Sequence, residues 1–274
     1  MSKFLSGRFP GMRPYVPGEQ PQDRQFIKLN TNESPFPPAP GVFEAINRAE
    51  IERLNRYPDP DTRETSDIIA AHFGIKRANV LLGNGSDELL FFCFQAFCDS
   101  NIPACFADIS YGFYKVFAQV LCIPVRISPL NSNLNVVAAD YCPAGGTIFL
   151  ANPNTPTGLA LKPEEIEIIL KNNPDNVVVV DEAYVDFGAQ SAYRLIDRYD
   201  NLVVVQTMSK SRNLAGARIG YALACEELIT DLNSMKFSFN PYNINRLSLL
   251  AGSAAIQDTA YFTSCTERIQ QVRK

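Results

Sequence analysis

The sequence predicts an α/β fold built on a mostly parallel sheet, and two observations lead to that prediction. Short apolar runs alternate along the chain with stretches whose apolar residues recur at the spacing of an amphipathic helix. The runs are continuous and rich in β-branched residues rather than interrupted by polar ones, which is typical of strands buried on both faces. Strands that interleave with helices in this way favour parallel pairing.

Each element follows from this pattern in chain order. Strands are expected at residues 79–83, 103–109, 123–128, 146–151, 176–184, 201–207 and 218–224. Helices are expected at about 41–54, 62–73, 86–98, 112–120, 163–172, 226–236 and 243–256. The last stretch, residues 258–274, is also helix-like, with Asp258 in position to cap it.

Residues 1–40 are expected to form an extended arm. Eight of the 19 prolines lie before residue 41, and proline fixes φ and biases the preceding residue away from helix. The apolar segment FIKLN within this stretch is able to pack. We therefore expect the arm to lie against the body of the protein or against a neighbouring subunit.

The composition argues against several classes of protein. The chain has 274 residues, 46% of them apolar, which is enough for a substantial core. Its 29 acidic and 25 basic residues give a net charge of −4 without a basic stripe, which disfavours nucleic acid as a partner. No apolar run reaches the roughly 18 residues of a membrane span, and the first 20 residues lack the apolar core of a secretory signal.

The histidine and cysteine content narrows the chemistry. His72 is the single histidine, which disfavours a histidine-based metal site or a Ser-His-Asp triad. The seven cysteines form no C-x-x-C pair. We expect them to be buried apolar residues of a reduced, cytoplasmic protein.

Lys210 is the first candidate for chemistry. It follows the expected strand 201–207 in a turn of small residues, and Arg218 opens the next strand eight residues later. A lysine in a loop at a strand end is a candidate for imine formation. For an isolated Ser-Lys pair, the alternative of an ordinary surface lysine is more common.

Asp181 is the second candidate, because it ends a run of four valines at the edge where open α/β sheets bind ligands. Tyr184 follows three residues later. The alternative for Asp181 is a carboxylate that caps a turn or helix. A metal site formed by Asp181, Glu182 and Asp186 is disfavoured, because no supporting cluster of ligands occurs elsewhere.

The segment LLGNGSDEL, residues 81–89, predicts a strand, a glycine turn and the start of a helix. The backbone N–H groups of Gly85, Ser86 and Asp87 would then lie at a helix N-terminus, where phosphate binds. Ser86 or Asp87 as a simple N-cap is the alternative. The third glycine of the dinucleotide fingerprint is missing, so a nicotinamide dehydrogenase is disfavoured.

Nine segments of the chain occur in a familiar order: MRPYVPGEQ, KLNTNESPFPP, NRYPDPDT, LLGNGSDEL, SYGFYKV, NPNTPTG, VVVDEAYVDF, SKSRNLAGARIGYALA and PYNINRLSLLA. Together they resemble the fold-type I pyridoxal-phosphate (PLP) aminotransferases, and within them the histidinol-phosphate aminotransferases most closely. The resemblance implies a three-layer α/β/α large domain with a mixed sheet over residues 41–256. It also implies that residues 1–40 join small-domain or dimer contacts, and that residues 257–274 start a small domain whose remainder this chain lacks.

The resemblance assigns roles around the PLP ring. Lys210 would form the covalent bond to the cofactor, and its freed amine would then move the proton of the substrate α carbon. Asp181 would face the pyridine nitrogen and keep it protonated. Tyr184 would hydrogen-bond the phenolic oxygen of the ring. Tyr111 would stack on the ring face, with a core tyrosine as the alternative.

The resemblance also assigns the phosphate and substrate contacts. The phosphate donors would be the backbone of Gly85, Ser86 and Asp87, the Ser209 hydroxyl and the Arg218 guanidinium. Tyr57 would reach this phosphate from the partner subunit, which implies a homodimer with shared active sites. Asn32 matches a family position near the substrate. Asn154 would contact the ring oxygen, but relatives often have asparagine where this chain has Thr155, so either residue is a candidate.

The implied reaction is transfer of an amino group between L-histidinol phosphate and 2-oxoglutarate, a step of histidine biosynthesis. Two alternatives use the same scaffold: a threonine-phosphate decarboxylase and a broad aromatic aminotransferase. A third is a truncated chain that binds PLP without full activity, because family members continue into a C-terminal domain that supplies an arginine for the substrate. We find no counterpart of that arginine in this sequence.

Overall fold

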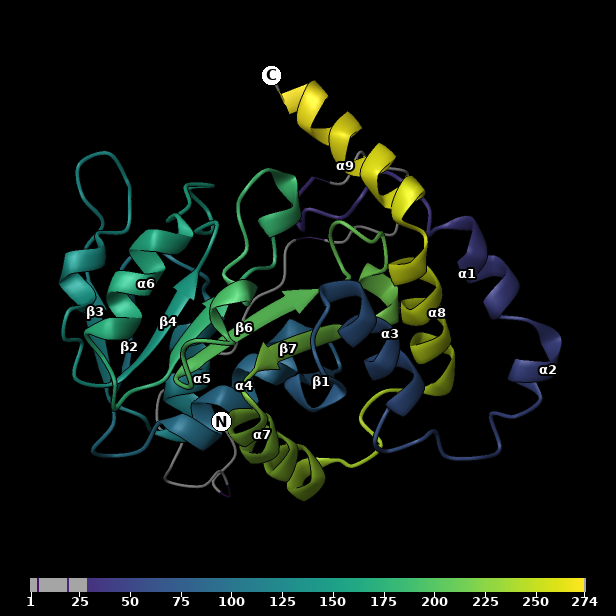
Figure 1. The fold of residues 1–274 in the computed structure, drawn as a ribbon, viewed down its shortest axis with the longest axis horizontal. Helices are drawn as coiled ribbons and strands as arrows, with labels where there is room; N and C mark the ends of the chain where they lie inside the picture. The colour runs from purple at the N-terminus through teal and green to yellow at the C-terminus, as the bar shows by residue number, and fades with distance from the viewer. Residues whose placement is uncertain (1–3, 5–18, 20–28, 274) are drawn as a thin grey trace.

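A seven-stranded sheet runs through the middle of the molecule in the computed structural model, which describes residues 4, 19 and 29–273. Its strands are β1 (Val80–Gly83), β2 (Ala104–Ala107), β3 (Val125–Ser128), β4 (Thr147–Ala151), β5 (Val178–Asp181), β6 (Leu202–Thr207) and β7 (Gly220–Ala224). The order across the sheet is β1-β7-β6-β5-β4-β2-β3 (Figure 1). Strand β7 pairs antiparallel with both β1 and β6, and all the other pairs of neighbouring strands are parallel. The mostly parallel mixed sheet and its seven expected strands are therefore confirmed.

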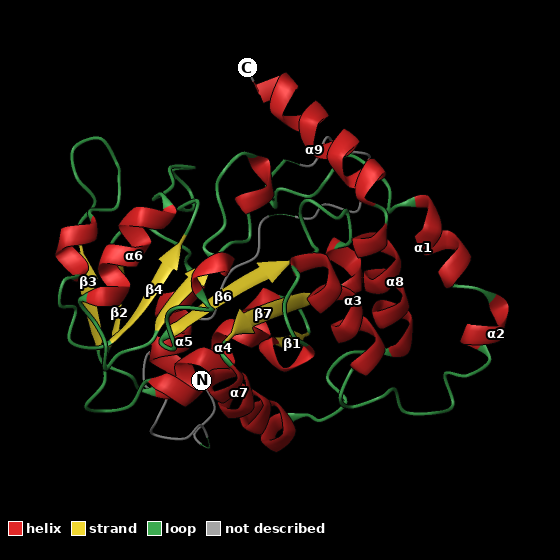
Figure 2. Cartoon of the chain, in the orientation of Figure 1, coloured by secondary structure: helices red, strands yellow, loops and turns green. Residues whose placement is uncertain are grey.

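Helices cover both faces of the sheet, so the fold has three layers (Figure 2). They are α1 (Pro40–Ala45), α2 (Arg48–Ile51), α3 (Arg63–Phe73), α4 (Ser86–Phe97), α5 (Phe113–Leu121), α6 (Pro163–Lys171), α7 (Glu226–Phe239), α8 (Arg246–Gln257) and α9 (Thr259–Arg273). Val178 and Val180 of β5 belong to the apolar core that includes residues of α3, α6 and α8, whereas Val179 between them belongs to the core that includes residues of α4, α5 and α7. Both faces of β5 are thus buried, which explains its unbroken valine run.

Two expectations about burial are wrong. The β3 strand is exposed, with Val125 and Ile127 at 46% and 43% exposure, because it lies at the edge of the sheet and is paired on one side only. The cysteines are not all buried: Cys122 is exposed, and Cys142 and Cys225 are half-buried. Cys122 follows the last turn of α5, where the chain turns at φ +58° on the surface.

The single helix expected at 41–54 is broken into α1 and α2. Ile46 leaves helical geometry at ψ 78°. Asn47 then starts a new helix, because its side-chain oxygen accepts hydrogen bonds from the backbone N–H groups of Ala49 and Glu50, at 3.0 and 3.3 Å. Apolar spacing reports which side of a helix is buried, and it does not reveal a cap inside the pattern.

Helix α9 extends away from the body of the molecule and carries the C-terminal end (Figure 1). The Asp258 carboxylate accepts from the Tyr261 N–H at 3.1 Å, so the expected cap is confirmed. The Tyr261 hydroxyl donates to the Pro37 carbonyl at 2.9 Å, which ties α9 to the chain preceding α1. No helix among the described residues is long and apolar enough to cross a membrane.

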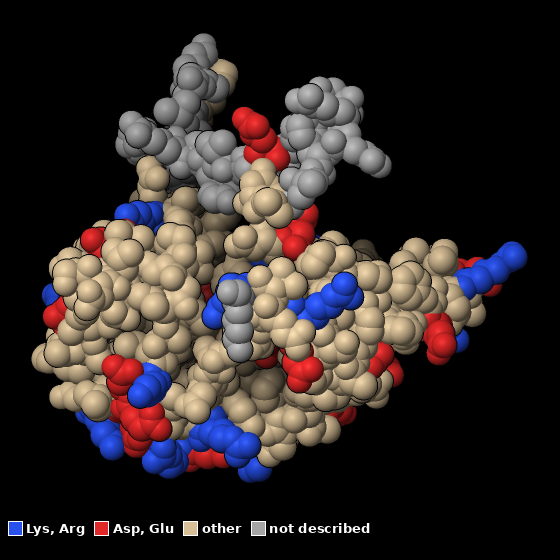
Figure 3. Space-filling view, turned by 90° about the horizontal axis from the view of Figure 1, so that it is seen from above, with Lys and Arg blue, Asp and Glu red and all other residues tan. Residues whose placement is uncertain are grey.

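Most of the expected arm, residues 1–40, lies outside the described residues, and the division into domains stays a prediction. In the described part of the arm, Thr31 and Asn32 contact the candidate residues Lys210 and Tyr184, which are treated below. Acidic and basic side chains are interspersed on the molecular face seen in Figure 3, as the balanced charge of the chain leads one to expect.

Candidate active site

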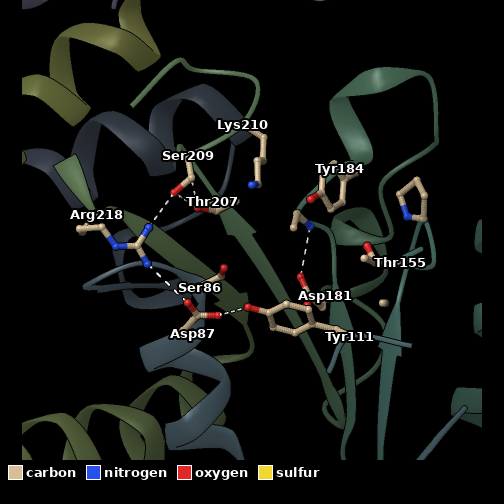
Figure 4. Close-up of a pocket in the computed structure, with 13 residues that line it drawn as sticks. Ser86, Asp87, Tyr111, Thr155, Asp181, Tyr184, Thr207, Ser209, Lys210 and Arg218 are labelled. Carbon is tan, nitrogen blue, oxygen red and sulfur yellow. Dashed lines mark hydrogen bonds and ion pairs between the residues drawn. The ribbon is translucent and has the colours of Figure 1, made fainter. Parts of the chain in front are cut away.

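A pocket of about 120 Å³ opens at the carboxyl ends of three parallel strands, β4, β5 and β6 (Figure 4). The last residue of each strand, Ala151, Asp181 and Thr207, lines it. The other lining residues are Ser86, Asp87, Tyr111, Pro153, Thr155, Ala183, Tyr184, Ser209, Lys210 and Arg218. Open α/β sheets bind their ligands at this edge, so segments far apart in the sequence meet where the fold predicts a site.

Lys210 lies three residues beyond the end of β6 and reaches into the pocket (Figure 4). Its ammonium donates to the backbone carbonyl of Thr31 at 2.8 Å. The same nitrogen lies 5.6 Å from the centre of the Tyr184 ring. Lys210 is therefore half-buried between the arm and Tyr184 rather than an ordinary solvent-exposed lysine.

Asp181 is a buried carboxylate at the floor of the pocket, with 5% of its surface exposed. Its Oδ1 accepts from the Ala183 N–H at 3.2 Å and its Oδ2 from the Tyr114 hydroxyl at 3.0 Å. The pKa of Asp181 is raised to about 6, chiefly by burial. The nearby Asp87 contributes to this rise, whereas the two hydrogen bonds act in the opposite direction. At neutral pH the group is thus a carboxylate held in a nearly dry site.

The N-terminus of α4 forms the opposite end of the pocket. Gly85 is the N-cap, at φ +83°, and no side chain caps the helix, so the alternative of Ser86 or Asp87 as a simple N-cap is wrong. A Cβ at residue 85 would lie 2.4 Å from Nη2 of Arg218, and the left-handed φ disfavours any other residue. Glycine here lets the guanidinium approach the helix terminus, which makes this end electropositive.

Arg218 is held at this end by Ser209 and Asp87, and it also donates to the Ala215 carbonyl at 3.5 Å. One Nη donates to the Ser209 hydroxyl at 3.2 Å, and the other pairs with the Asp87 carboxylate at 3.5 Å (Figure 4). The second oxygen of Asp87 accepts from the Tyr111 hydroxyl at 2.6 Å. One carboxylate therefore fixes both a cation at the anion-binding end and an aromatic ring in the pocket wall.

A larger cavity of about 1,210 Å³ adjoins the pocket and shares Lys210, Tyr184 and Thr155 with it. Asn32 lines this cavity, and its amide donates to the Tyr184 hydroxyl at 3.1 Å. Arg268 of α9 also lines it. The expected substrate residue, Asn32, thus lies beside the cavity through which a second molecule would reach Lys210.

The structure separates the two candidates in the 151–165 loop. Thr155 lines the smaller pocket, whereas Asn154 lines only the larger cavity. The Asn154 amide donates to the Ile109 carbonyl at 3.0 Å and to the Thr157 hydroxyl at 3.2 Å. Its Oδ1 is buried and has no hydrogen-bond partner within the described part of the chain. Asn154 therefore positions the loop, and a cofactor contact by its oxygen stays a prediction.

Tyr57 does not line the pocket of its own chain. It is 79% exposed and stacks on Tyr242, with ring centres 4.4 Å apart. The loop that carries it is anchored at Pro60, whose carbonyl accepts from the buried ammonium of Lys236. Its donation to a partner subunit stays a prediction.

The sequence pattern did not single out the polar groups of Tyr114, Thr207 and Thr31, which line the site or contact its residues. Tyr114 lies three residues after Tyr111, inside an apolar helix where a core role is the simpler expectation. Thr207 ends a strand, and Thr31 contributes only its carbonyl.

Among the described residues no cluster of three metal ligands occurs, and Glu182 faces Ser191 and Gln206 rather than Asp181.

The model of the aminotransferase class I and II family matches residues 24–274. This chain belongs to that family. The histidinol-phosphate aminotransferases of Brachyspira hyodysenteriae and of a Marinomonas species are 46% and 48% identical to it; each alignment covers all of this chain and 78% of the relative.

The solved structures agree with this membership. The histidinol-phosphate aminotransferase of Sinorhizobium meliloti, in complex with pyridoxal-5'-phosphate, superposes with a TM-score of 0.79 at 26% identity, over 88% of this chain and 67% of that one. An aspartate aminotransferase variant of Thermus thermophilus reaches 0.83 at 20% identity, over 98% and 76% of the two chains, which supports the fold alone. The fold-type I architecture expected from the sequence is therefore confirmed.

Proposed function

We propose that this chain is a PLP-dependent aminotransferase that acts on L-histidinol phosphate with 2-oxoglutarate as the amino acceptor. One observation supports the cofactor above all: a single pocket brings together a lysine amine, a buried carboxylate and a cationic helix terminus. This donor set fits PLP, which needs a lysine for its aldehyde, an anion for its pyridine nitrogen and donors for its phosphate. When bound, PLP supplies an electron sink for the carbanion at the substrate α carbon.

The phosphate end is formed by Arg218, Ser209 and the first turn of α4. The guanidinium fork and the backbone N–H groups of Ser86 and Asp87 are the donors that bind a phosphate. A dianion placed here would be attracted by Arg218 and by the helix dipole, and repelled by the Asp87 carboxylate. Asp87 therefore acts by holding Arg218 and Tyr111 in place rather than by binding the anion through its side chain.

The ring end is formed by Asp181, Tyr184 and Tyr111. Asp181 offers a carboxylate oxygen to the pyridine nitrogen, and its burial strengthens that ion pair. Tyr184 would offer its hydroxyl to the ring oxygen, and Thr155, which lines the same pocket, is the second candidate for that role. Tyr111 supplies the aromatic face.

Lys210 is the acid–base group. Its amine lies between the smaller pocket and the cavity lined by Asn32, which is where the α carbon of a substrate would enter. The Thr31 carbonyl holds the ammonium in this position when it is not bonded to a cofactor. From there the amine takes the proton of the α carbon and later returns it.

The substrate assignment rests on the relatives, which are named histidinol-phosphate aminotransferases at 46% and 48% identity along the whole chain. We expect purified protein loaded with PLP to transfer the amino group of L-histidinol phosphate to 2-oxoglutarate, with loss of transfer in Lys210→Ala. Release of carbon dioxide from L-threonine phosphate would favour the decarboxylase instead. Faster transfer from aromatic amino acids would favour the broad aminotransferase.

We further propose a cytoplasmic homodimer in which Tyr57 completes the partner's phosphate site. The support is the position of Tyr57, which is 79% exposed and does not line the pocket of its own chain. Sedimentation of the same sample should give the mass of two 30.4 kDa chains, and a monomer at assay concentration would contradict the shared site.

A further inference from the structure

Tyr114 is a buried hydroxyl group that the mechanism above does not use. It lies in the first turn of α5, and none of its side chain is exposed. Its ring packs among aromatic side chains of the core, with centres 5.7 Å from Phe106 and 5.8 Å from Phe149. Its hydroxyl donates to Oδ2 of Asp181 at 3.0 Å. Burying a hydroxyl group costs free energy unless it is hydrogen-bonded. The hydrogen bond to Asp181 offsets that cost.

The hydrogen bonds of Asp181 fix the orientation of its carboxylate. The Ala183 N–H occupies Oδ1 and the Tyr114 hydroxyl occupies Oδ2, one donor on each oxygen. Each carboxylate oxygen has a second lone pair, so the group can still accept a bond from a ligand in the pocket that it lines. Without Tyr114, Oδ2 would lose the one hydrogen bond that it accepts from the described residues.

Tyr114 also supports the aromatic wall of the pocket. Its ring meets Tyr111 edge to face, with centres 5.6 Å apart and an interplanar angle of 86°. This geometry is the favoured one for two aromatic rings. One side chain therefore contacts both the carboxylate at the floor of the pocket and the ring in its wall.

We propose that Tyr114 is a positioning residue that holds Asp181 ionised and directed at the pyridine nitrogen of the cofactor. The inference rests on the proposed function, because it concerns the pocket that would hold PLP. Tyr114 acts through Asp181 and does not touch the ligand itself, since it is absent from the pocket lining.

The electrostatic surroundings make this support necessary. Burial favours the neutral carboxyl and raises the pKa of Asp181, and Asp87 of α4 adds to that rise. Cys93, also on α4, lies near Asp181. Burial raises the pKa of the Cys93 thiol, and the charge of Asp181 adds to that rise. The pKa of Tyr114 is raised well above its ordinary value by burial, so its hydroxyl keeps its proton and acts as a donor. Lys210 and Arg218 are the cations that line the same pocket.

The test replaces the hydroxyl alone, with Tyr114→Phe in the full chain. The probe is pyridoxamine 5'-phosphate, which has no aldehyde to bond to Lys210, so its affinity reports the ring and phosphate contacts. Inorganic phosphate is the second probe, because it reports the phosphate end only. Tyr141→Phe is the matched control, since Tyr141 is equally buried but belongs to the core on the other side of the sheet.

We expect Tyr114→Phe to weaken pyridoxamine 5'-phosphate binding by about five- to tenfold between pH 6 and pH 5 and by about twofold at pH 7, because loss of one hydrogen bond to the carboxylate lowers the ionised fraction of Asp181. Phosphate affinity should change by less than about twofold. The loss of pyridoxamine 5'-phosphate affinity on acidification should begin about one pH unit higher than in the wild type, because Asp181 then takes up its proton at a higher pH. Tyr141→Phe should change none of these.

Two results would overturn the inference while the proposed function stands. One is wild-type affinity and an unchanged pH profile in Tyr114→Phe. The other is an equal loss of both probes together with a lower melting temperature, which would indicate a purely structural role. Failure of the wild type to bind pyridoxamine 5'-phosphate is a different result, and it would overturn the proposed function itself.

Discussion

Asp181 and Glu182 are consecutive acidic residues with opposite surroundings. Asp181 faces the pocket, whereas Glu182 is 1% exposed and turned into a polar cluster on the far side. Its oxygens accept from the Ala192 N–H at 2.7 Å, from Ser191 at 2.5 Å and from Gln206 at 2.7 Å. Two of these bonds join Glu182, at the start of the loop that carries Tyr184, to Ser191 and Ala192 at its end. Burial nevertheless raises the pKa of Glu182 to about 7.

A pH-dependent stability follows from that raised pKa. The folded state holds the Glu182 proton up to about pH 7, whereas the unfolded chain releases it near 4.5. The free energy of unfolding therefore falls as the pH rises through this window. We expect it to fall by about 2–3 kcal/mol more in the wild type than in Glu182→Gln, measured by urea unfolding across the window. Parallel curves for the two proteins would contradict this assignment.

The residues identified from the sequence lie at strand ends or helix starts. Such positions are visible in the local pattern of apolar and polar residues. Lys210, Asp181 and Gly85 follow this rule, and the structure brings all three to one edge of the sheet. Tyr114 and Glu182 do not, because their partners Asp181 and Gln206 are distant in sequence. Pairings across the fold become visible only once the strands are placed side by side.

At the scale of elements, the contact between β7 and the start of α4 shapes the phosphate end. A Cβ on Gly220 would lie 2.6 Å from the Ser86 nitrogen and 2.7 Å from the Gly85 carbonyl carbon. Both are backbone atoms, which cannot swing aside as a flexible side chain would. The antiparallel strand β7 thus approaches the helix terminus closely because its first residue has no side chain.

Gly220→Ala should therefore displace the first turn of α4. We expect a loss of about 1–3 kcal/mol in the free energy of unfolding, as for other overpacked sites, and weaker binding of inorganic phosphate. Gly216→Ala is the matched control, because a Cβ there meets nothing within 4 Å. Phosphate binding that is unchanged in Gly220→Ala, or equally weakened in both variants, would contradict the role assigned to this contact.

The sequence predicts elements better than their interruptions and their order. All seven strands were predicted from their apolar runs, although the burial expected of β3 is wrong, whereas the break at Ile46 depends on a cap by Asn47 that apolar spacing hides. The antiparallel insertion of β7 between β1 and β6 is likewise hidden, since an apolar run does not identify its neighbours.

At the scale of the whole molecule, two apolar cores on either side of one sheet hold the strand ends that form the site. Helix α9 and the chain before α1 meet across the larger cavity, through the bond from Tyr261 to Pro37 and the contact of Arg268 with the Phe36 ring at 5.7 Å. The larger cavity beside Lys210 is therefore lined by residues 32–36 and α9 together with loops from the middle of the chain, whereas the smaller pocket is lined by the middle of the chain alone.

The central claim is that Lys210 binds PLP covalently in this pocket. The most direct measurement is borohydride reduction of the protein after incubation with PLP, followed by peptide mapping by mass spectrometry. We predict one pyridoxyl phosphate group per chain, on the peptide that contains Lys210, and no such label in Lys210→Ala. Label spread over several exposed lysines, or retained undiminished in Lys210→Ala, would contradict the account.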